Sequence, residues 1–323
     1  MYFYALIVFY IAFIAKKNKE RSAFINNLAN SIVLFTSITI NLIIITFLNL
    51  QNNDFIVFPY DIFMLSFIFF FLPAFYLLVV NEKRKVKKKS ASSIKIESRT
   101  SKVLPLKYDI YRKATHLVVL MIIFFYFSIF LFEGNIILFN QNLVIFLVGI
   151  SLIGLLTADF VRILKPEYYP LKPVNRILRE KELHMRVGSH ISMAVGCFST
   201  ILLFGLFHPF GPLSICTSIT MTIFGDISSN LVGRTIGNKQ IRNTNKTYEG
   251  LLAGIISTIV SGMIILSLLK DYYFTSPLGF LVLPLSGALI FGILDYLDLE
   301  IDDNLTYTLI IASILFFISL FIA

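Results

Sequence analysis

Long apolar segments recur along this chain and limit what it can fold into. A helix that crosses a membrane needs about 20 mainly apolar residues. Ten segments near that length are found at 1–15, 31–50, 57–80, 114–133, 142–158, 189–207, 213–233, 249–269, 277–296 and 305–322. We therefore predict an all-α fold, a polytopic transmembrane bundle of about ten helices.

The composition agrees with this prediction. Of the 323 residues, 57% are hydrophobic and 15% are charged, whereas a soluble domain is about 45–50% apolar and about 25% charged. Scarce charge and 33 Phe also exclude disorder and a coiled coil. Cys197 and Cys216 lie within apolar runs and are interpreted as buried small hydrophobes. In a signal peptide the basic residues precede the apolar run, but here the first basic cluster follows it.

The basic residues alternate along the chain. The connections 16–30, 81–113, 159–188 and 234–248 hold 27 of the 28 Lys and Arg residues. The connections between them hold none, except for Lys270. Positively charged connections stay in the cytoplasm, so we expect the N-terminus outside and the basic side inside. The net charge of +9 then indicates a membrane protein and no nucleic-acid partner.

The basic connection 81–104 divides the chain into parts. We predict accessory helices at 1–80, a cytoplasmic linker at 81–104 and a catalytic transmembrane domain at 105–323. The linker is interpreted as a solvated topology signal. Its alternative role is attraction to anionic lipid headgroups, about 1 kcal/mol per basic residue.

Charged residues at membrane depth are candidates for function. The first cluster begins the segment 114–133, where Arg112 and His116 share a helix face next to Lys113. The alternative is structural: Arg112 and Lys113 anchor the helix at the membrane interface, and His116 fills a polar seam.

A second cluster follows the segment 142–158. Asp159 and Arg162 precede a proline-bearing loop, after which we predict a helix over 175–182. Its charges form either a solvated face or, through Arg179 and Glu182, part of a nucleotide site.

The third cluster is the strongest. Asp226, Asn230 and Arg234 recur every four residues and so share one helix face. A carboxylate can hold a divalent ion, and a guanidinium can fork onto phosphate. Gly233 and Gly237 permit close approach of a backbone or a phosphate. The alternative is a close helix crossing around a buried polar pair.

A fourth cluster precedes the segment 249–269. Lys246 is placed to neutralise phosphate, and Glu249 to bind metal or to pair with Lys246. The alternative is helix capping, with Thr247 at the helix start and Glu249 in its first turn.

The fifth cluster is acidic. Asp295, Asp298, Glu300, Asp302 and Asp303 lie in one connection without Lys or Arg. Such carboxylates repel one another unless a cation compensates, and Mg²⁺ is the obvious candidate. The alternative is a plain acidic loop. Together the five clusters suit a magnesium nucleotide and a lipid substrate, and the chain has no G-x-S-x-G or H-E-x-x-H hydrolase motif.

Four of these motifs, in their order along residues 105–323, resemble the CTP-dependent lipid alcohol kinases. That family includes dolichol and polyprenol kinase, phytol kinase and the CTP-using diacylglycerol kinase. The motifs are Arg112-Lys113-x-x-His116, Gly225-Asp226 with Val232-Gly233-Arg234-x-x-Gly237-x-Lys239, Lys246-Thr247-x-Glu249-Gly250, and Asp302-Asp303-Asn304-Leu305-Thr306. The chain departs from the family at Asp295, where relatives usually carry Glu, and by lacking a proline after the last motif.

The resemblance implies transfer of the γ-phosphoryl group of CTP to the hydroxyl of a polyprenol- or dolichol-type lipid, with Mg²⁺ or another divalent cation. The implied roles are catalysis by Asp226, Lys246, Glu249 and His116; nucleotide binding by Arg234, Gly233, Gly237, Lys239, Arg179 and Glu182; a lipid entrance at Arg112, Lys113 and His116; and metal binding by Asp226, Asp302, Asp303 and Asn304.

Alternatives remain open. A CDP-lipid synthase would use the same nucleotide, and a kinase of this class would equally act on diacylglycerol or phytol-like alcohols. A secondary transporter would place its polar residues at the bilayer midplane, whereas these clusters lie at one edge. A scaffold protein would explain none of the clusters.

Overall fold

The computed structural model describes residues 1–47, 59–89, 105–129, 135–241, 244, 246–270 and 277–322. These residues form an all-α fold, as predicted, with one isolated bridge between Gln240 and Thr247. The helices are α1 (Tyr2–Lys17), α2 (Arg21–Phe47), α3 (Tyr60–Lys89), α4 (Leu106–Leu117), α5 (Leu120–Ile129), α6 (Asn135–Leu164), α7 (Ser189–Phe204), α8 (Phe210–Thr235), α9 (Tyr248–Leu269), α10 (Pro277–Leu297) and α11 (Asp303–Ile322).

Eight helical segments in the described residues are long and apolar enough to cross a membrane, with α4 and α5 counted together. The apolar helix α7 is shorter, and α1 has 16 residues. These segments confirm a multi-pass membrane bundle and correspond in order to the ten predicted spans. The side of the membrane that each end faces stays a prediction.

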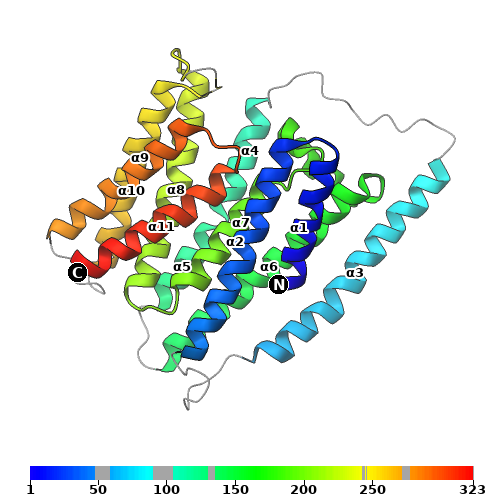
Figure 1. Cartoon of the computed structure of the whole chain (residues 1–323), viewed down its shortest axis with the longest axis horizontal. Helices are drawn as coiled ribbons and strands as arrows, with labels where there is room; N and C mark the ends of the chain where they lie inside the picture. The colour runs from blue at the N-terminus through cyan, green and yellow to red at the C-terminus, as the bar shows by residue number, and fades with distance from the viewer. Residues whose placement is uncertain are drawn as a thin grey trace.

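Helix α8 lies at the centre of the bundle, where it packs against α5, α7, α9 and α11 (Figure 1). Every residue from Gly211 to Ile223 is buried. Its crossing with α9 is too close for side chains, since a Cβ at Gly250 would lie 2.6 Å from the carbonyl oxygen of Ser229. Small residues permit such crossings between membrane helices. The crossing fixes the polar end of α8 against the start of α9.

Helices α1 and α2 form a hairpin that packs on α7 (Figure 1). A buried polar row on α2 bonds to α7 along its length: Asn30 Nδ2 donates to Ser192 Oγ at 3.1 Å, and Asn41 Nδ2 to the carbonyl of Leu202 at 2.7 Å. Polar side chains that bond across helices hold membrane helices together. The division at 80 and 104 stays a prediction, and 90–104 lie outside the described residues.

Four connections converge at one end of the bundle, the upper end in Figure 1. They are α1–α2, α6–α7, α8–α9 and α10–α11, and Arg21 at the start of α2 pairs with Glu300 before α11 at 3.4 Å. In sequence these are three of the basic connections and the acidic one. The bundle therefore gathers both kinds of charge at one end.

The predicted helix over 175–182 is wrong. The described chain forms short 3₁₀ turns at Lys172–Arg176 and Glu180–Glu182 instead. Proline residues upstream lack an N–H donor, and Arg162 on α6 donates to the carbonyls of Glu182 and Arg186. Those carbonyls bond to a side chain and not to a helical ladder, so the segment stays irregular.

Candidate functional site

A polar cleft of about 790 Å³ opens at the end of the bundle where these connections meet. Its walls come from the start of α4, the last turns of α8, the α6–α7 connection, the α8–α9 loop and the α10–α11 connection. The lining residues are Asp109, Arg179, Glu180, Lys181, Asp226, Ser229, Asn230, Gly233, Arg234, Gly237, Asn238, Gln240, Lys246, Thr247, Asp295, Asp298, Leu299 and Asp303. Seven of the predicted site residues are among them.

Asp226 lies in the wall of the cleft on α8, paired with the buried ammonium of Lys113 from α4. His116, one turn further along α4, places its Nδ1 3.7 Å from Asp226 Oδ2, too far for a direct hydrogen bond. Both His116 ring nitrogens are buried without a hydrogen-bond partner in the described structure. The structure thus brings the three predicted residues together. It excludes the alternative of interfacial anchors, because Arg112 and Lys113 are buried.

Asp109 is a residue of this site that the sequence analysis missed. Its Oδ1 accepts from Arg112 Nε at 3.1 Å, and its Oδ2 accepts from Arg234 at 2.7 Å. It therefore clamps α4 to the end of α8 with a buried carboxylate between two guanidinium groups. The signal was present, since Asp109, Arg112 and His116 recur at the spacing of one helix face.

Lys246 supplies the positive charge within the acidic α10–α11 connection. Its Nζ lies 3.0 Å from Asp295 Oδ1, 3.1 Å from Asp303 Oδ2 and 3.3 Å from Asp298 Oδ1. Burial alone would lower the pKa of Lys246, but the carboxylates of Asp303 and Asp295 outweigh burial and raise it. Ser229 and Tyr307 also donate to Asp295, at 3.0 and 2.8 Å.

Asp302 and Asn304 support this connection from behind and do not line the cleft. Asn304 donates to Asp302 Oδ1 through its side chain at 2.9 Å, and Arg186 lies 3.8 Å from Asp302 Oδ2. Burial alone would raise the pKa of Asp302, but Arg186, Lys181 and Arg179 outweigh burial and lower it. These contacts hold the Asp302 carboxylate in place within the protein.

A metal site was predicted at Asp226, Asp302, Asp303 and Asn304. In the part of the chain that is described, no three His, Cys, Asp or Glu side chains gather closely enough to hold an ion alone. Magnesium bound with phosphates needs only one or two carboxylates, all through oxygen. Asp298 and Asp303 in the cleft wall fit that requirement.

Arg179 and Lys181 face the same cleft from the α6–α7 connection. In the described residues neither has a carboxylate within salt-bridge distance, unlike Lys113, Arg234 and Lys246. Burial would lower the pKa of Arg179, yet Glu182 and Asp302 raise it. Burial, with Arg186 next, lowers the pKa of Lys181. Glu182 itself is fully buried, and its Oε2 accepts from the N–H of Arg179 at 3.2 Å.

Gly237 and Glu249, near the two ends of the α8–α9 connection, both contact neighbouring parts of the protein. A Cβ at Gly237 would lie 2.4 Å from Thr247 Oγ1, so the group that approaches Gly237 closely in this structure belongs to the protein and is not a phosphate. Thr247 accepts from the N–H of Gly250 at 3.2 Å, which confirms the capping alternative. The partly exposed Glu249 accepts from the N–H of Lys239 at 3.3 Å. Neither Glu249 nor Lys239 lines the cleft, and among the described residues the carboxylates within salt-bridge distance of Lys246 are those of Asp295, Asp298 and Asp303.

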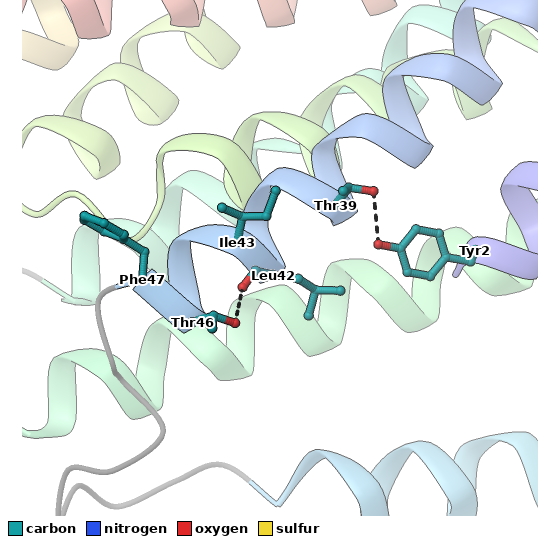
Figure 2. Close-up of a pocket in the computed structure, with 6 residues that line it drawn as sticks. All are labelled: Tyr2, Thr39, Leu42, Ile43, Thr46 and Phe47. Atoms are coloured by element: carbon teal, nitrogen blue, oxygen red, sulfur yellow. Dashed lines mark hydrogen bonds between the residues drawn. The ribbon is translucent and has the colours of Figure 1, made fainter.

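A second hollow, of about 430 Å³, lies between α1 and the later turns of α2 (Figure 2). Its walls are mainly apolar, from Leu42, Ile43 and Phe47, and the hydroxyls of Tyr2 and Thr39 bond to each other at 3.1 Å. It gathers no carboxylate, lysine, arginine or histidine. The charged candidate residues therefore lie at the polar cleft and not at this hollow.

Neither a protein-family model, nor a curated protein sequence, nor a solved structure matches this chain. The residues of the cleft and the motif resemblance are therefore what indicate a function.

Proposed function

We propose that this protein is a CTP-dependent lipid alcohol kinase that phosphorylates a polyprenol- or dolichol-type alcohol. One observation carries the proposal: a cleft at the end of a membrane bundle combines a carboxylate held by a buried lysine, Asp226 with Lys113, and cations from the α6–α7 connection, the last turn of α8 and the α8–α9 loop. Phosphoryl transfer requires mainly positioning and charge neutralisation. The motif resemblance supports CTP as the donor.

In the proposed reaction, the lipid hydroxyl oxygen forms a bond to the γ-phosphorus as the bond to the leaving CDP oxygen breaks. Asp226 accepts the hydrogen bond of that hydroxyl and receives its proton. Lys113 keeps Asp226 charged and fixes its direction from α4. A magnesium ion bound with the nucleotide would neutralise phosphate charge, with Asp298 and Asp303 as its protein oxygens.

The remaining basic residues of the cleft are proposed to bind the triphosphate. Arg179 and Lys181 reach the cleft without a carboxylate partner among the described residues, so they are the cations with most capacity for phosphate. Arg234 approaches from α8 while Asp109 orients it. A guanidinium binds phosphate through two parallel hydrogen bonds, which adds geometry to charge.

The lipid tail is proposed to stay in the bilayer beside α8. Phe224 and Leu231, before and after Asp226 on this helix, are exposed, at 38% and 43%. Their apolar side chains can contact acyl or isoprenoid chains while the hydroxyl reaches the cleft. The gathering of basic connections at this end supports a cytoplasmic active site.

The direct test is incubation of purified protein with [γ-³²P]CTP and, in separate reactions, polyprenol, dolichol, phytol and diacylglycerol. We expect label in a lipid phosphate and release of CDP. Asp226→Asn should abolish transfer, while Asp61→Asn, at an exposed aspartate at the start of α3, should leave it unchanged.

Two outcomes would overturn the proposal. Label on none of the alcohols would exclude the kinase. Pyrophosphate release, with label from [α-³²P]CTP appearing on phosphatidate, would instead establish the CDP-lipid synthase.

A further inference from the structure

The segment 179–188 of the α6–α7 connection, called the arm below, is irregular but tightly held. Arg186, Val187 and Gly188 are buried. From α6, Arg162 donates to the carbonyls of Glu182 and Arg186, and Asp159 accepts from the N–H of Gly188 at 3.2 Å. Buried backbone groups outside a helix need such partners. The arm therefore takes its shape from side chains of neighbouring helices.

Helix α2 contributes partners of the same kind. Asn27 Nδ2 donates to the carbonyl of Met185 at 2.8 Å, and its Oδ1 accepts from the N–H of Val187 at 2.9 Å. One amide side chain thus holds the backbone on both sides of Arg186. Asn27 is itself fully buried, so these two bonds account for its polar atoms.

Arg186 extends the attachment to the rest of the cleft. It donates to Ser22 Oγ at 2.5 Å, to the carbonyl of Glu300 at 3.0 Å and to Asn26 Oδ1 at 3.3 Å. Asn26 Oδ1 also accepts from the N–H of Asp302 at 2.9 Å. The start of α2 therefore bonds to both the arm and the acidic connection that carries Asp303.

The other end of the arm enters the cleft. Arg179 and Lys181 line it, and in the described residues neither has a carboxylate within salt-bridge distance. Only three residues separate Lys181 from Met185, whose carbonyl Asn27 holds. A shift of the held part thus moves the two cations. Cations on a fixed backbone bind a multivalent anion without first losing the entropy of a mobile loop.

We propose that the arm is a polyphosphate-binding element, with Lys181 beside Arg179 as its contact residues, and that α2 positions it through Asn27. The first two helices are then part of the binding site and not accessory to it. This inference rests on the proposed function for the identity of the natural ligand, a nucleoside triphosphate, but its test uses an inorganic probe.

The experiment measures binding of inorganic tripolyphosphate to the full-length protein by calorimetry, without lipid alcohol or CTP. Lys181→Ala removes a contact, and Asn27→Ala removes only the support. The matched control is Asn41→Ala, which deletes one buried amide bond from the same helix at the far end from the arm. We expect affinity to fall by about tenfold in the first two variants and to stay within about twofold in the control.

Asn27→Asp separates positioning from general loss of structure. It keeps an acceptor for the N–H of Val187 but loses the donor to Met185, so we expect an intermediate affinity. It also serves if Asn27→Ala does not fold. Equal affinities in wild type and Asn27 variants would overturn the role of α2. Unchanged affinity in Lys181→Ala, or no binding by wild type, would overturn the arm as a binding element. Normal tripolyphosphate binding without transfer from CTP would instead contradict only the proposed kinase.

Discussion

Replacement of Lys246 by Met should destabilise the end of the bundle where the cleft lies. The substitution keeps the apolar stem and removes an ammonium that lies within 3.0 to 3.3 Å of three carboxylates. Breaking a buried ion pair costs about 3–5 kcal/mol, and an exposed pair contributes about 0–1 kcal/mol. Lys246 is intermediate, with 23% of its side chain exposed, while Asp295 has 6%. We expect a loss of about 2–3 kcal/mol in unfolding free energy.

The assay is thermal unfolding in detergent, with a double-variant cycle. If the penalty comes from uncompensated carboxylates, Asp303→Asn should cost less in the Lys246→Met background than in wild type. Magnesium at millimolar concentration should also raise the melting temperature of Lys246→Met more than that of wild type, because the cation replaces the missing charge.

The pH dependence has a definite sign. The folded pKa of Lys246 is raised, so its contribution is fully present below the unfolded value of about 10.4 and is lost as pH rises through the folded value. The stability gap between wild type and Lys246→Met should therefore be constant from about pH 7 to 9 and shrink above about pH 10.4. Equal melting temperatures, or strictly additive substitutions, would refute the reasoning.

Three further predictions concern the cleft and the elements that support it. Asp226→Asn should lower phosphoryl transfer by at least about a hundredfold in the labelled-CTP assay, at a temperature where a melting curve shows the variant folded. It should also lower the melting temperature, because it leaves the buried Lys113 ammonium without its carboxylate. Gly250→Ala should cost about 1–3 kcal/mol of stability, since its Cβ would lie 2.6 Å from a backbone oxygen, whereas Gly149→Ala, with only the Phe198 ring at 3.4 Å, should be tolerated. The folded pKa of Asp302 is lowered, so its contribution to the unfolding free energy is present above about pH 4 and is lost as pH falls through the folded value. The difference in unfolding free energy between wild type and Asp302→Asn should therefore shrink below about pH 4.

Hydropathy predicted the helical segments because each span must satisfy its own backbone hydrogen bonds in lipid. Hydropathy gave no guide at 175–182, because this polar segment lies outside the lipid and its backbone need not bond within a helix. There Arg162 donates to the carbonyl of Glu182, and just beyond it Asp159 and Asn27 accept from the N–H groups of Gly188 and Val187, so the partners come from other helices. Sequence periodicity cannot report such contacts, because their geometry exists only after the helices have packed.

Charge patterns identified residues that the structure brings together, but not always their partners. The acidic connection was expected to hold magnesium, yet its positive charge in the structure is Lys246, 49 residues before Asp295. Glu249 was expected beside Lys246 and instead accepts from the backbone of Lys239. The pairing of Asp226 with Lys113 was not expected either, although Lys113 and His116 are three residues apart and share the helix face that meets Asp226.

The asparagines of α2 explain why the front helices looked inert in sequence. Asn26 and Asn30 lie in the connection 16–30 and Asn41 in the apolar segment 31–50; none carries a charge, so a search for ionisable groups passes over them. An amide that faces neither water nor lipid must bond to protein, and the partner it bonds to then decides its role. Asn41 bonds to α7 and stabilises packing. Asn26 and Asn27 bond to Asp302 and the arm, so the same residue type, about four turns along one helix, determines the shape of the cleft.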